Sequence, residues 1–147
     1  MIKDFCKAWE KNNGRLRGYI SSHNQSEYSN YSDLVKIIFE QCINPYIIET
    51  NGKYCRKTFN INNLTEIDDG DYQGTLLFII PLNTYQPIID EYIVTYVDYG
   101  SCSYCDTLQG IQDFGIDIPT ESQVNDYMEL LLHLLQNCKW VIDKEEK

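Results

Sequence analysis

Two cysteines with the spacing of a thiol or metal site, Cys102 and Cys105, are the residues best suited to chemistry. They begin a predicted short helix over residues 101–111, where the free amides of a helix N-terminus lower the pKa of a thiol. Thiolate chemistry or metal binding would use that position. Against it, Asp98 and Asp106 flank the pair and oppose a thiolate. Packing of two small side chains at a junction between a strand and a helix is therefore the favoured interpretation.

A zinc site at this pair needs two further ligands, which structural zinc sites usually supply as a second close pair. The other thiols and imidazoles are scattered along the chain, at Cys6, Cys42, Cys55, Cys138, His23 and His133. A composite zinc site that adds Cys138 or His133 from the C-terminal helix is therefore the metal hypothesis. Glu129 lies one helical turn from His133, although the leucines around that histidine favour a structural role.

The acidic turn Asp68-Asp69-Gly70-Asp71 lacks the ligand spacing and the flanking helices of a calcium-binding EF-hand. It predicts a solvated hairpin turn, with opportunistic cation binding as the alternative. The glycines fit no phosphate-binding or dinucleotide-binding spacing, and no residue pairs with either histidine to build a catalytic triad. We therefore assign no catalytic residues. A chain of this length can fold without disulfides or a structural metal, so we expect no cofactor apart from the zinc hypothesis.

The N-terminal elements that position these residues are predicted as helices and a hairpin. Apolar spacing predicts a helix over residues 2–11, stopped by Asn12-Asn13-Gly14, and a polar loop over residues 21–32. Ser32 is expected to cap a second helix over residues 33–43, which Pro45 ends. Residues 46–50 and 53–59 then form a predicted hairpin around Asn51-Gly52.

The rest of the chain predicts a sheet followed by a long helix. Strands are expected over residues 60–67, 73–82 and 91–99, and the apolar character of the last two predicts central strands covered on both faces. Thr120 and Gln123 form a capping box that begins a helix over residues 121–142. The fold class is α+β, a single domain over residues 1–147 with a mainly antiparallel sheet of four to five strands and helices from both chain ends packed on it.

Two stretches, residues 67–78 (IDDGDYQGTLLF) and 99–109 (YGSCSYCDTLQ), resemble small uncharacterised proteins carried by phages and mobile elements of Gram-positive bacteria. Residues 126–136 are similar to the C-terminal helix of the same group. The likeness covers residues 61–139 and leaves the first 60 unmatched. It implies a shared acidic core with a variable N-terminal part and carries no activity with it.

The charge follows the same division. The chain of 147 residues has 12 basic and 22 acidic side chains, a net charge of -10. Residues 1–60 have a balance of +3 and residues 61–147 one of -13, and residues 58–138 contain thirteen acidic side chains and no Lys or Arg. Direct binding of nucleic acid through this half is disfavoured, because phosphate contacts need Lys and Arg.

Seven of the twelve tyrosines lie in the base-free segment, where acidic and tyrosine side chains together suit a basic, nucleic-acid-binding protein partner. We expect a phage-type, non-enzymatic interaction protein that inhibits a host defence or nucleic-acid-processing protein. The most specific version of this hypothesis is an inhibitor of anti-CRISPR type. The alternatives are a zinc- or thiol-dependent protein centred on Cys102 and Cys105, or a self-associating structural protein. The expected interaction residues are Asp68, Asp69, Asp71, Tyr72, Asp98, Tyr99, Tyr104 and Asp106.

The first residues contain no apolar run of signal-peptide length, and no stretch approaches the roughly 20 apolar residues of a membrane span. We therefore expect a protein of the host cytoplasm with no membrane partner. Its six cysteines are then read as free thiols rather than as three disulfides.

Overall fold

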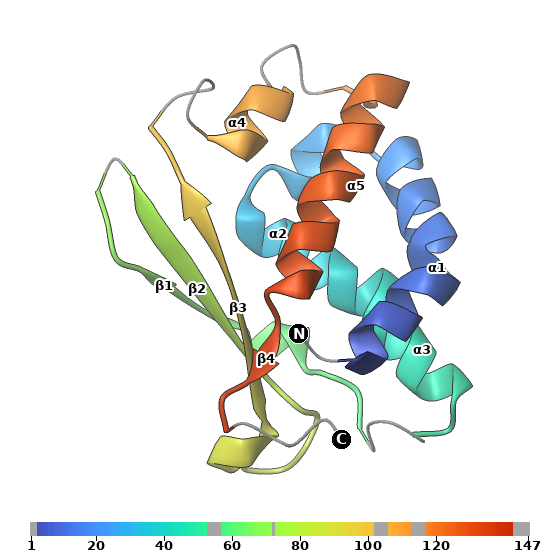
Figure 1. Cartoon of the computed structure of the whole chain (residues 1–147), viewed down its shortest axis with the longest axis vertical. Coiled ribbons are helices and arrows are strands. Elements are labelled where there is room, and N and C mark those ends of the chain that lie inside the picture. Colours follow the sequence, from blue (N-terminus) through green and yellow to red (C-terminus); the bar gives the residue numbers. More distant parts are fainter. Residues whose placement is uncertain (1–2, 53–56, 72, 102–105, 113–116, 143–147) are drawn as a thin grey trace.

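The computed structural model describes residues 3–52, 57–71, 73–101, 106–112 and 117–142. Its sheet is antiparallel throughout and follows the order β1-β2-β3-β4. This single α+β domain confirms the predicted fold class (Figure 1). The strands are β1 Thr65–Asp68, β2 Gly74–Pro81, β3 Tyr92–Tyr99 and β4 Lys139–Trp140, and the helices are α1 Lys3–Ser22, α2 Tyr31–Ile38, α3 Asn44–Glu49, α4 Thr107–Gln112 and α5 Glu121–Gln136.

The hydrophobic core lies between the helices and one face of the sheet. Phe78, Ile80 and Ile93 alternate with less buried neighbours along β2 and β3, and all three are fully buried. Helix α5 packs on β3 and also on α1, so the two ends of the chain meet in the core. Figure 1 shows the helices gathered on one side of the sheet.

The opposite face of the sheet, which we call the outer face, is apolar and partly exposed. The register places Ile67, Leu77 and Tyr96 in one row across three strands and Ile79 and Val94 in the next. Ile67 is 47% exposed and Tyr96 is 41% exposed. The prediction that β2 and β3 are central strands is confirmed, but the prediction of cover on both faces is wrong, because the helices occupy one side.

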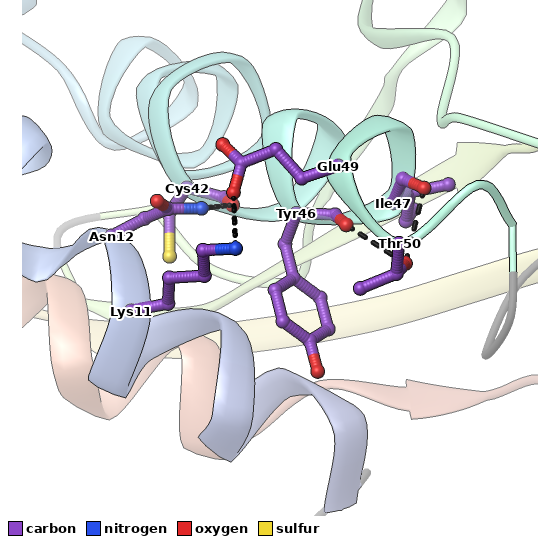
Figure 2. A network of polar contacts seen from close by, with 7 residues as sticks. All are labelled: Lys11, Asn12, Cys42, Tyr46, Ile47, Glu49 and Thr50. Carbon is purple, nitrogen blue, oxygen red and sulfur yellow. Dashed lines mark hydrogen bonds and ion pairs between the residues drawn. The ribbon is translucent and has the colours of Figure 1, made fainter.

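Helix α1 runs through the predicted stop at residues 12–14, so that prediction is wrong. Asn12 is buried and its side chain donates a hydrogen bond to the carbonyl of Cys42 at 2.9 Å, while Lys11 forms an ion pair with Glu49 (Figure 2). Packing of α1 against the segment that contains Cys42 therefore outweighs the weak helix propensity of the Asn-Asn-Gly sequence.

Pro45 does not end the second helix, and the hairpin predicted from residue 46 onward is wrong for its first strand. A π-helical turn, Phe39–Ile43, widens the helix just before Pro45, which then lies in the first turn of α3, where a missing amide is tolerated. Asn51 and Gly52 do have positive φ angles, of 54° and 71°. They terminate α3, since the Gly52 amide donates to the carbonyl of Ile47.

The predicted ends of the other helices are confirmed in part. The capping box of Thr120 and Gln123 begins α5 as predicted. The helix ends at Gln136 instead of continuing to residue 142, because the next residues turn back to pair with β3 as β4. Helix α2 is capped by Asn30, whose side chain accepts from the Asp33 amide, in place of the predicted Ser32.

The strand predicted over residues 60–67 begins later, at Thr65, after a 3₁₀ turn, Ile61–Asn63. The predicted helix over residues 101–111 is described from Thr107 onward, as α4, and residues 102–105 lie outside the described part. Among the described helices, none combines the length and the apolar character needed to cross a membrane.

Candidate functional site

An acidic cluster lies at the end of the sheet where β1 turns into β2 and where β3 ends. Gly74 at the start of β2 pairs with Tyr99 at the end of β3, and Asp68 at the end of β1 pairs with Leu76. Figure 1 shows this hairpin turn lying away from the helices. We call the cluster the acidic tip, and its described members are Asp68, Asp69, Asp71, Asp98 and Tyr99.

Neutral groups hold three carboxylates of the acidic tip in place, those of Asp68, Asp69 and Asp98. The hydroxyl of Tyr99 donates to Asp68 Oδ1 at 2.5 Å, and the Gly70 amide donates to the same oxygen at 2.9 Å. Thr75 donates twice, from its amide to Asp69 at 2.7 Å and from its hydroxyl to Asp98 at 2.8 Å. Because these donors carry no charge, they order the carboxylates and leave their negative charge uncompensated.

The bond between Tyr99 and Asp68 also shifts both acid–base equilibria. Donation from the Tyr99 hydroxyl, with help from the Gly70 amide, lowers the pKa of the Asp68 carboxyl below its ordinary value. The same bond, with smaller effects of desolvation and of the neighbouring aspartates, raises the pKa of Tyr99 to about 12. At neutral pH, Asp68 is therefore ionised and Tyr99 is a neutral donor.

The turn that carries the aspartates depends on glycine at position 70. A Cβ atom there would lie 2.1 Å from the backbone oxygen of Gln73, a distance that no packed side chain tolerates. A Cβ atom at Gly74 would lie 2.7 Å from the Asp69 carboxylate. The two ends of the turn thus approach more closely than residues with side chains allow.

Asp106 was predicted as a surface residue, and the structure instead places it in the interior, only 4% exposed. Its carboxylate accepts hydrogen bonds from the Tyr31 hydroxyl at 2.8 Å and from the amides of Gly100 and Gln109. Asp106 thus caps α4 and ties it to α2 and to the end of β3, so we leave it out of the interaction surface. Tyr72 and Tyr104, also predicted there, lie outside the described residues.

Of the two described residues proposed as extra zinc ligands, one is buried and the other is exposed. Cys138 is buried, donates to the carbonyl of Leu134, and has a pKa raised to about 12 by burial, which disfavours the thiolate that binds metal. His133 is exposed on α5. No cluster of three potential metal ligands occurs among the described residues. Cys102 and Cys105 lie outside them, so the zinc or thiol hypothesis stays a prediction.

A second acidic feature was not anticipated from the sequence. Asp126, Glu129 and His133 follow one another at helical intervals along the exposed side of α5 and line a concave surface together with Tyr96 and Asp98 of β3. The spacing of the first three is visible in the sequence as the polar stripe opposite the apolar one. Their approach to Asp98 depends on the packing of α5 against β3, which local sequence patterns do not specify.

Comparison with known proteins gives no relative for this chain: no protein-family model, curated protein or solved structure matches it.

Proposed function

We propose that the protein is a non-enzymatic interaction protein that binds a basic, nucleic-acid-binding protein of its host through the acidic tip. The observation that carries the proposal is the set of carboxylates Asp68, Asp69 and Asp98, ordered by neutral donors and therefore presenting their full charge. Electrostatic complementarity of this kind gives both specificity and fast association.

The proposed mechanism is competition with nucleic acid. A groove that binds DNA or RNA is lined with Lys and Arg at the spacing of phosphates, and ordered carboxylates offer the same charges to it. The acidic tip would occupy that groove and exclude the nucleic acid. The resemblance of residues 61–139 to phage proteins suggests a host defence or nucleic-acid-processing protein as the target. Inhibition of a CRISPR protein is the most specific version of this proposal.

The experiment captures proteins from a Gram-positive bacterial lysate on the immobilised chain and identifies them by mass spectrometry. We expect DNA- or RNA-binding proteins that are released by added salt and by competing duplex DNA, because both weaken the same contacts. The matched control is the isosteric tip variant Asp68→Asn/Asp71→Asn, which should lose most of the capture. Capture that resists high salt, or that is equal on the tip variant, would contradict the proposal.

A second candidate function, self-association, is favoured by the outer face of the sheet. Ile67, Leu77 and Tyr96 form an apolar row with two exposed members, and contiguous exposed apolar surface is typical of protein interfaces. Light scattering coupled to size-exclusion chromatography tests it. A dimer that becomes a monomer in Ile67→Lys would support this function, and a monomeric wild-type protein would remove it.

A further inference from the structure

A groove with a volume of about 660 Å³ runs between the edge of β3 and the helices α4 and α5. Asp98 contributes from β3, and Asp126 and Glu129 contribute from α5. No Lys or Arg is among the described residues that line it. Acidic charge in a concave site acts more strongly than on a convex surface, because the low-dielectric walls focus the field.

The same groove exposes part of the edge of β3. Strand β4 pairs with β3 only at Ile93 and Val94, and no other described strand pairs with that edge towards Tyr99. An unpaired strand edge offers backbone donors and acceptors to another extended chain.

Two hydrogen bonds identify the β3 residues whose backbone groups face this edge. The Val141 amide donates to the carbonyl of Tyr92, and the side-chain amide of Asn137 donates to the carbonyl of Tyr96 at 3.1 Å. Backbone groups alternate in direction along a strand, so the amide and carbonyl of Asp98 face the groove as well. At the far end, the Gly100 amide bonds to Asp106 and its carbonyl accepts from Gln109.

We infer that this groove binds an extended peptide segment that carries arginine or lysine. The segment pairs through its backbone with Asp98 on the open edge of β3, between the Asn137 and Asp106 side chains that cap the edge on either side. Its basic side chains lie against Asp126 and Glu129. Charge complementarity selects this occupant, since the carboxylates of Asp126 and Glu129 line the groove beside an edge that accepts any extended backbone. The inference rests on the proposed function for the basic character of the partner, but it concerns a different surface from the turn at residues 68–71.

The test uses a fluorescently labelled hexa-arginine peptide and measures its binding by fluorescence anisotropy at low salt. The groove variant Asp126→Asn/Glu129→Gln is compared with the tip variant Asp68→Asn/Asp71→Asn, which removes the same number of charges. We expect the groove variant to weaken binding roughly tenfold, in line with two lost charge pairs, and the tip variant to change it much less. Circular dichroism confirms that both variants are folded.

Nuclear magnetic resonance then locates the peptide at the resolution of single residues, from the chemical-shift changes that the unlabelled peptide causes. We expect the largest shifts at the backbone amide of Asp98 and the side-chain amide of Asn137. A peptide that fails to bind, or that weakens equally in both variants, overturns the groove inference. Weakening in the tip variant alone also overturns it but leaves the proposed function in place, whereas weakening in the groove variant alone supports it, and the lysate capture on the tip variant then decides separately whether the acidic tip binds the partner.

Discussion

At the scale of single residues, the acidic tip keeps its negative charge because the donors that order its aspartates are uncharged. Asp68 accepts from a phenol and an amide, and Asp69 and Asp98 accept from Thr75. Pairing with Lys or Arg would fix the same geometry but cancel the charge. For the proposed binding of a basic protein, neutral donors are an advantage, because they fix the carboxylates without reducing their charge.

Replacing Tyr99 by Phe removes one of the two donors to Asp68, and we expect the pKa of that carboxyl to rise toward its ordinary value of 3.8. The sign follows from the folded state, in which the pKa is lowered: the stabilising contribution of Asp68 is present above about pH 4 and is lost as the pH falls through the lowered pKa. A carboxyl-carbon NMR titration measures the change. Tyr96→Phe, which alters a tyrosine on the opposite face of the same strand, is the control and should leave the Asp68 titration unchanged; an unchanged curve in Tyr99→Phe would disprove the assignment.

Asp106 is an acidic residue whose burial could not be predicted from residue type alone. The same carboxylate that composition assigns to an acidic surface is buried and bonded to Tyr31 and Gly100. A signal for this role was present in the sequence, since Asp106 followed three residues later by Gln109 resembles the capping pattern of Thr120 and Gln123. A helix of six residues has little periodicity of its own, which hides such a cap.

At the scale of elements, we expect substitution by Ala to have opposite effects on the free energy of unfolding at two glycines, Gly70 and Gly14. Gly70→Ala places a methyl group against the Gln73 backbone and should lower the free energy of unfolding by about 1 to 3 kcal/mol, as overpacking does. Gly14→Ala lies in the interior of α1 with nothing within 4 Å of the new methyl group, and should raise it by about 0.5 to 1 kcal/mol. Urea denaturation compares the two variants with the wild type, and a stabilised Gly70→Ala protein would show that the turn is not closely packed.

The elements that the sequence predicts correctly are those set by local chemistry. The capping box of α5 and the acidic turn between β1 and β2 depend on residues within a few positions of one another. Asn12 and Pro45 mislead, because distant packing of α1 and a π-helical turn keep the chain helical through them. The groove beside α5 could not be predicted for the same reason, since β3 and α5 meet through tertiary contacts.

At the scale of the whole molecule, the first 60 residues are not an addition to a separate core. Of the 29 buried apolar residues in the described part, 16 precede residue 61. Arg17 on α1 donates to Asn125 on α5, and Tyr127 on α5 donates to the buried Gln25. The basic-leaning and acidic parts therefore form one hydrophobic core, even though the charge divides sharply between them.

We expect a fragment of residues 61–147 to lose cooperative unfolding, because the face of α5 that packs on α1 and α2 would meet water. Urea denaturation followed by circular dichroism measures it against the full chain. Adding residues 1–60 as a separate peptide should restore a sigmoidal transition. A fragment that unfolds alone at the same urea concentration as the full chain would show that the acidic part is an independent domain.

The contact between α1 and α5 also has a consequence for how the protein is made. Arg17 and Asn125 are 108 positions apart, so α1 leaves the ribosome well before its partner helix. At about 5 to 20 residues per second, the delay is roughly 5 to 20 s. During that interval the apolar sides of α1 and α2 have no α5 to cover them, so we expect the nascent chain to be prone to aggregation until α5 has been synthesised.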